Sequence, residues 1–257
     1  MKYALLPLDW QESTANFDPA KNSLFKIDSN IAGHMTGKSA CGCFALTVSS
    51  NAIDLVERLY DFIQYENEHG RKVQVFSRDV DVRTLLRNSQ PKREAVRYAV
   101  HSTLLSSYEQ IQKDGRLKST ARLRREGLNR TAIGFAPLGE PTDYLEYVMF
   151  APVDDSIGNE MVVNSHLRGA VCYDPNAAYA PQARMYFDAA KIASDGLAVY
   201  DGAHFLKVYD ALPLAGYHLL TVFVKDVALP ERAVYWTPAT FTAAADAYFY
   251  EKMEDYA

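Results

Sequence analysis

The spacing of hydrophobic residues separates the first 95 residues, which contain a clear helix, from a strand-rich remainder. Between residues 53 and 65 apolar side chains recur every three or four positions, which predicts a helix that ends by His69–Gly70. The other elements predicted for this region are strands at 24–27, 44–48 and 73–76 and a short helix over 80–87.

After Arg97 the rhythm changes to alternation. A strand is predicted from Tyr98 into His101, and a helical stripe then continues through Ile111 to Asp114–Gly115, with capping-box patterns at Ser106 and at Ser107. The further predicted elements are strands at 144–151, 161–163, 169–173, 184–187 and 218–224, a short helix over 189–193, a hairpin that joins 197–200 to 205–208 through Asp201–Gly202, and a terminal helix over 240–253.

The order of these elements predicts an α+β fold. Beyond residue 96 strands dominate and helices are few and short, unlike the regular alternation of a doubly wound parallel sheet. We therefore expect an N-terminal α/β region over 1–95, whose role the sequence leaves open, and a strand-rich domain over 96–257.

Composition places the chain among globular proteins. It has 257 residues, of which 48% are hydrophobic and 23% charged, enough for one sizeable core or two modest ones. No apolar run approaches the roughly 20 residues that span a bilayer, and the first residues lack a secretory pattern. Of three cysteines, Cys41 and Cys43 are too close for a comfortable bridge, which favours a reducing compartment. We expect a cytoplasmic protein without a membrane partner.

Charge is distributed unevenly along the chain. The net charge is −5, which argues against a protein coated in basic surface for duplex binding. Between Lys113 and Arg130, however, seven basic residues stand against two acidic ones, a local balance of +5. This stretch predicts either a solvated helical face or a site for an anion such as a pyrophosphate or a nucleic-acid strand.

Two short motifs indicate other chemistry. Ala32-x-x-x-x-Gly37-Lys38-Ser39 fits the loose pattern of a phosphate-binding loop, but the residues after it favour a strand where that loop needs a helix. Cys41 and Cys43 with His34 could supply three zinc ligands, whereas a closed structural site needs four. We therefore expect buried thiols and no metal site, and keep a P-loop nucleotide-binding protein as an alternative.

The segment Val100–Leu117, VHSTLLSSYEQIQKDGRL, resembles the first motif block of the histidine-type ADP-ribosyltransferase superfamily. Two branches fit, the DarT-type DNA ADP-ribosyltransferases and the RNA 2′-phosphotransferases. In this block a strand ends in His-x-Thr and a short helix ends near a glycine, here Gly115. The resemblance implies that His101 holds the adenosine-side ribose of NAD, that Ser102 and Thr103 meet the nicotinamide amide through their backbone, and that Gly115 belongs to the same NAD-binding element.

Later segments continue the resemblance in order, over about residues 97–225. The stretch 121–130 lies where DarT-like enzymes carry a catalytic arginine, which implies Arg124 or Arg125 as the residue that holds pyrophosphate or assists transfer. The segment 143–155 is similar to a strand of the type "YV-x-x-F-x-Pro", in which Tyr147 would stack on nicotinamide. The segment 184–217 is similar to the third block of both branches.

One departure from the family affects the catalytic prediction. DarT-like proteins carry Ala-Glu-Phe-Leu in the third block, whereas this chain has Ala-His-Phe-Leu with His204 in place of the glutamate. A carboxylate stabilises the cationic ribosyl species and deprotonates a nucleophile, while histidine can do only the second.

The resemblance implies a split β-sheet core and an enzyme that consumes NAD as a substrate and passes ADP-ribose to a single-stranded nucleic acid or a protein, with His204 facing the acceptor. The alternative is a catalytically inactive binding module of the same fold. The sequence leaves the acceptor and the oligomeric state open.

Overall fold

A computed structural model gives the fold of the chain, and it describes residues 10–12, 18, 21–40, 42–89, 91, 96–128, 140–153 and 157–254. The predicted α+β class is confirmed. Contacts group the chain into two compact units. Unit 1 comprises 1–95, 135–144 and 200–205, and unit 2 comprises 96–134, 145–199 and 206–257.

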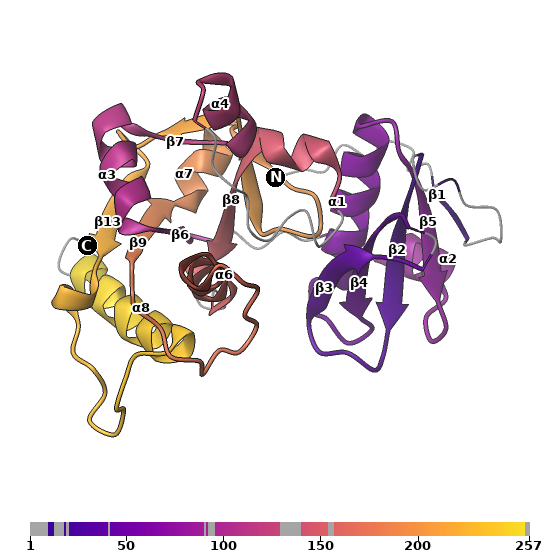
Figure 1. Ribbon diagram of the computed structural model, residues 1–257. Coiled ribbons are helices and arrows are strands. Elements are labelled where there is room, and N and C mark those ends of the chain that lie inside the picture. The colour runs from indigo at the N-terminus through magenta and orange to yellow at the C-terminus, as the bar shows by residue number, and fades with distance from the viewer. Residues whose placement is uncertain are drawn as a thin grey trace. The chain divides into compact units, whose positions relative to one another are not determined.

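Unit 1 is built on a five-stranded sheet (Figure 1). Its elements are β1 (Trp10–Glu12), β2 (Asn22–Asp28), β3 (His34–Lys38), β4 (Phe44–Ser49), α1 (Leu55–Glu68), β5 (Lys72–Ser77) and α2 (Val82–Asn88). The strand order is β1-β5-β2-β4-β3, in which only the edge strand β3 runs antiparallel to its neighbour. Helix α1 connects the parallel strands β4 and β5, and Leu59, Phe62 and Ile63 on it are fully buried.

Two segments from later in the sequence complete unit 1. Tyr144, which is 1% exposed, packs edge-on against the rings of Phe44 and Tyr65. Asp143 accepts hydrogen bonds from Arg71 and from the Tyr65 hydroxyl. The core of unit 1 therefore extends beyond residues 1–95.

Unit 2 is built on a six-stranded antiparallel sheet. The strands of this sheet are β6 (Tyr98–Thr103), β8 (Tyr147–Pro152), β9 (Ala183–Asp188), β10 (Ala198–Val199), β11 (Leu206–Tyr209) and β13 (His218–Val222). Two further strands of unit 2, β7 (Arg116–Lys118) and β12 (Ala211–Pro213), pair with each other in a separate two-stranded sheet. Its helices are α3 (Leu105–Asp114), α4 (Thr120–Arg125), α6 (Ile157–Arg168), α7 (Ala189–Ser194) and α8 (Pro238–Glu254), with 3-10 turns η1 (Thr142–Glu146), which begins in unit 1, and η3 (Val224–Asp226).

The large sheet consists of two halves that are joined only briefly. The strand order is β10-β11-β8-β6-β9-β13, so β8 and β6 lie at the centre. β6 pairs with β9 over its whole length, from Tyr98 to Thr103, but its register with β8 covers only Ala99 and Val100. From His101 onward β6 stays with β9 alone, and the sheet splits between β6 and β8.

Helices α6 and α8 cover one face of this sheet (Figure 1). Val100 and Tyr186 on the sheet join Phe241 and Phe249 of α8 in one buried cluster. The strands predicted at 161–163 and 169–173 are wrong, because α6 spans the first segment and the second forms no strand. Among the described residues, no helix is long and apolar enough to cross a membrane.

Candidate functional site

His101 lies where β6 leaves β8. Its Nδ1 is 3.1 Å from the carbonyl oxygen of Met149 on β8. A carbonyl can only accept, so Nδ1 carries the proton and the neutral ring presents Nε2 as an acceptor. Burial lowers the pKa of His101 below its ordinary value, which keeps this tautomer at neutral pH. At the split, the His101 ring thus bonds to β8 where a continuous sheet would have a backbone hydrogen bond between β6 and β8.

Ser102 and Thr103 continue β6 past the split. They pair with Arg184 and Ala183 of β9, and no register with β8 is found for them in the described part of the chain. A strand that loses its neighbour on one side offers backbone groups to a ligand. This geometry is compatible with the role that the resemblance implies for their backbone.

A buried charge network, which the sequence did not predict, joins β9 to helices α6 and α8. Arg184 on β9 is 0% exposed and bridges Glu160 of α6 and Asp246 of α8. Its Nη1 is 3.1 Å from Glu160 Oε1, and its Nη2 is 2.8 Å from Asp246 Oδ1. A buried arginine requires such partners, but local pattern could not show which acids would meet it.

Tyr147, the predicted nicotinamide-stacking residue, starts β8 on the other side of the split. Its ring contacts Tyr209 edge-on at 5.6 Å, and Lys207 Nζ lies 4.5 Å from its centroid. Lys207 is 0% exposed on β11, directly opposite Met149. The Lys207 ammonium group therefore already lies against the Tyr147 ring.

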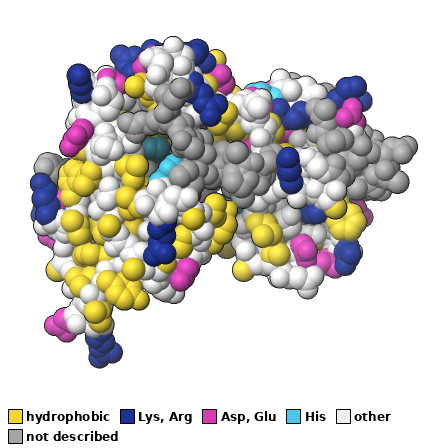
Figure 2. All heavy atoms as spheres, in the orientation of Figure 1, with side chains coloured by type: hydrophobic (Ala, Val, Ile, Leu, Met, Phe, Trp, Pro, Cys, Tyr) yellow, Lys and Arg dark blue, Asp and Glu magenta, His cyan; other side chains and the backbone are white. Residues whose placement is uncertain are grey.

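Three basic side chains of this stretch, Lys118, Arg122 and Arg125, form ion pairs with carboxylates of unit 2. Arg125 bonds Glu146 at 2.8 Å and Asp210 at 2.6 Å, and Arg122 pairs with Asp210 and Glu126. Figure 2 shows acidic side chains among the Lys and Arg side chains that gather near α4. Arg124 is exposed and has no ion pair with any residue that the structure describes, whereas Arg130 lies outside the described residues.

Gly115 has a structural role. It adopts φ +64° just after α3, the left-handed conformation that ends helices, and its carbonyl accepts from Leu214 N at 2.9 Å. It thereby fixes the direction of the chain between α3 and β7. The structure shows no further role for it.

His204 belongs to unit 1, whereas His101 belongs to unit 2. Its Nδ1 is 2.9 Å from Oδ2 of the fully buried Asp201, and its Nε2 is 3.6 Å from Glu140 Oε1. The other oxygen of Asp201 accepts from the backbone N–H groups of Ala203 and His204. Asp201 is therefore the group that orients the His204 ring.

The described residues of the phosphate-binding-loop pattern and of the cysteine pair do not form a ligand site. Gly37 and Lys38 lie in edge strand β3, and the chain turns from there into β4, so Lys38 does not begin a helix. Cys41 lies outside the described residues and Cys43 is 1% exposed. Among the described side chains, no group of three His, Cys, Asp or Glu could hold a metal ion.

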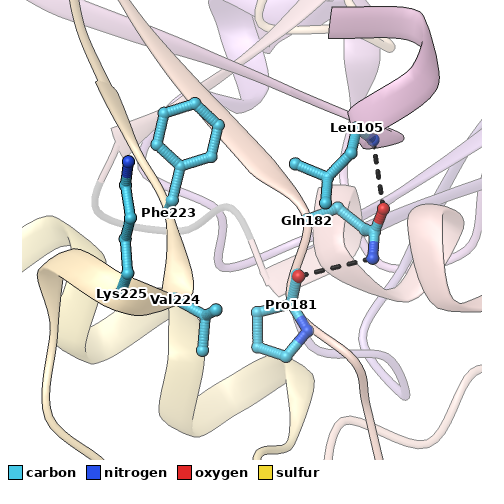
Figure 3. Close-up of a pocket in the computed structure, with 6 residues that line it drawn as sticks. All are labelled: Leu105, Pro181, Gln182, Phe223, Val224 and Lys225. Atoms are coloured by element: carbon cyan, nitrogen blue, oxygen red, sulfur yellow. Dashed lines mark hydrogen bonds between the residues drawn. The ribbon is translucent and has the colours of Figure 1, made fainter.

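An apolar hollow of about 260 Å³ lies at the start of α3 (Figure 3). Its lining consists of Leu105, Pro181, Gln182, Phe223, Val224 and Lys225. Gln182 Oε1 accepts from Leu105 N at 3.1 Å and so caps the helix in place of the predicted capping box. None of the predicted site residues lines this hollow.

Neither protein-family models, nor curated proteins, nor solved structures gave a match to this chain.

Proposed function

We propose that unit 2 binds NAD where β6 parts from β8, and that the chain passes ADP-ribose to a nucleic-acid or protein acceptor. The observation that carries this is His101, held neutral at the split by its bond to Met149. The resemblance of residues 97–225 to ADP-ribosyltransferases supports it, because it implies that the histidine of the His-x-Thr strand end holds the ribose of NAD.

The geometry suggests a distinct task for each group. The free Nε2 of His101 would accept a hydrogen bond from a ribose hydroxyl, and the open edge at Ser102 and Thr103 would pair with the nicotinamide carboxamide. Arg124, which is exposed, is a better partner for pyrophosphate than Arg125, whose guanidinium already bonds two carboxylates.

The test measures NAD binding and nicotinamide release on the full chain. Isothermal titration should detect NAD binding in the wild type and lose it in His101→Ala. His218→Ala is the matched control, because His218 is another partly buried histidine of the same sheet whose Nε2 bonds Thr221. Unchanged NAD binding by His101→Ala would overturn the proposal.

A second candidate is a module that binds NAD or a related nucleotide without transfer. The surroundings of His204 and Arg125 favour it, because both residues are held by carboxylates. Both side chains are thus already engaged in contacts with carboxylates, unlike a catalytic group that is ready to act on a substrate. NAD binding without nicotinamide release would support this candidate, whereas release that disappears in His204→Ala would exclude it.

The acceptor is found by mass analysis. Single-stranded oligonucleotides and proteins are incubated with the chain and NAD, and a product heavier by one ADP-ribose identifies the acceptor class. The His101→Ala variant serves as the blank, so that any addition it still shows is not due to the proposed site.

A further inference from the structure

The first turn of α6 contacts β6 on both sides of His101. Asn159 Nδ2 donates to the carbonyl of Val100 at 3.2 Å, and Val100 is the last β6 residue in register with β8. Two residues further along β6, the hydroxyl of Ser102 donates to Glu160 Oε1. Adjacent residues of one helix thus hold the strand immediately before and immediately after the point of the split.

Glu160 also connects β6 to β9. Its Oε1 accepts from both Ser102 and Arg184, which face each other as cross-strand partners. The hydroxyl of Tyr179 donates to the other oxygen, so the carboxylate is fully engaged and 1% exposed. Because charged hydrogen bonds of this kind are directional, the contact fixes the register of Ser102 as well as its distance from α6.

This contact acts on His101 through strand geometry. Side chains alternate across a strand, so fixing Ser102 toward α6 turns the His101 ring to the opposite face. The ring there reaches the Met149 carbonyl and lies 5.9 Å from the Phe150 ring. We propose that Asn159 and Glu160 form a clamp that keeps β6 on β9 past His101, and that Glu160 is a positioning residue for the NAD-binding edge.

The clamp proposal rests on the proposed NAD site for its function, but its structural part can be tested without NAD. The full chain is labelled with ¹⁵N and ¹³C at histidine, and the His101 ring signals are followed by NMR against pH. The variants are Ser102→Ala and Ser102→Thr. Tyr179→Phe is the matched control, because it removes a different hydroxyl that bonds the same carboxylate.

Ser102→Ala should move the His101 ring signals and weaken NAD binding roughly tenfold, the scale of one charge-assisted hydrogen bond. Ser102→Thr, which keeps the hydroxyl, should restore both. Tyr179→Phe should lower the melting temperature yet leave the His101 signals in place. The clamp is overturned if Ser102→Ala and Tyr179→Phe lower the melting temperature alike and neither moves the His101 signals.

The two proposals fail in different ways. If the wild type binds no NAD, the proposed function is wrong, while the ring signals still decide whether the clamp positions His101. If NAD binds and the Ser102→Ala signals stay unchanged, the NAD site stands and the clamp is wrong.

Discussion

His101 owes its chemistry to one hydrogen bond and to partial burial. The Met149 carbonyl fixes its proton on Nδ1, and burial lowers its pKa. A histidine whose pKa is lower in the folded than in the unfolded state binds fewer protons when folded. Its contribution to stability is therefore present above the ordinary pKa of about 6.5 and is lost as the pH falls below it.

The same protonation should control ligand binding. A protonated ring has no acceptor at Nε2, so NAD affinity should be constant at neutral pH and fall as the pH drops through the folded-state pKa of His101, which lies below the ordinary histidine value. Calorimetric titrations from pH 7.5 down to the pH at which the chain begins to unfold measure this. In His218→Gln the pH dependence should persist, and an affinity that stays flat over that whole range would show that the neutral ring is not required.

The structure also explains why residue 202 is a glycine. Gly202 has φ +73°, and a Cβ there would lie 2.2 Å from the Arg58 carbonyl oxygen and 3.0 Å from Phe62 Cβ. Its own carbonyl accepts from Arg58 Nη1 at 2.9 Å. Only glycine therefore allows the segment 200–205 to lie against α1.

Gly202→Ala should destabilise the chain by at least about 3 kcal/mol, from left-handed strain and overpacking together. Gly196→Ala is the matched control, because Gly196 has φ +74° and open space around its Cβ position. The control should show the strain alone, about 1–2 kcal/mol. Urea unfolding measures both, and equal losses would mean that α1 does not constrain position 202.

At the scale of elements, buried charge decides how the helices of unit 2 meet the sheet. Arg184 on β9 joins α6 through Glu160 and α8 through Asp246. Burial by itself lowers the pKa of Arg184, but its surroundings, including both carboxylates, raise it overall, so the guanidinium stays charged in the interior. Three elements are thus oriented by one side chain.

Arg184→Met should cost about 3–5 kcal/mol, because it leaves two carboxylates without their cation. Arg125→Met is the comparison, since Arg125 also bonds two carboxylates but is 51% exposed. Its loss should cost far less stability, because solvent screens an exposed ion pair. Chemical unfolding of both variants checks the difference, and similar losses would contradict a special role for the buried network.

At the scale of the whole molecule, the two units do not correspond to two continuous stretches of sequence. Unit 1 includes 135–144 and 200–205. Arg71 bonds both Glu66 and Asp143, and the Tyr144 ring fills space between Phe44 and Tyr65. A cut after residue 95 would leave this part of the core open.

A fragment of residues 1–95 should therefore lack a cooperative thermal transition, or melt well below the full chain. Within the full chain, Tyr144→Ala should cost about 3–5 kcal/mol, the range for deleting a buried aromatic ring. Circular dichroism melts test the fragment and urea unfolding tests the variant. A fragment that melts as cooperatively as the full chain would show that the later segments contribute little.

The spacing of hydrophobic residues alone predicted many of the helices and strands. It located α1, α3, α8 and most of the strands, and it gave the α+β class. It failed at 161–163, because an apolar run of three in α6 is as compatible with a helix as with a strand. It also placed a two-residue turn at Asp201–Gly202, whereas 200–205 all lie between the paired strands β10 and β11.

The sequence by itself determined which residues were candidates: His101 at a strand end, a cluster of arginines and an unusual His204. Only the tertiary structure decided what each one meets. Asp210 and Glu146 neutralise Arg125, Asp201 orients His204, and Asn159 and Glu160 hold β6 beside His101. The physical reason is that local pattern fixes the face on which a side chain lies, whereas charge pairing and desolvation depend on residues distant in the sequence. His101 remains the central candidate, because its place at a strand end comes from the local sequence pattern. Its tertiary contacts, the bond to Met149 and its burial, then keep the ring neutral and oriented.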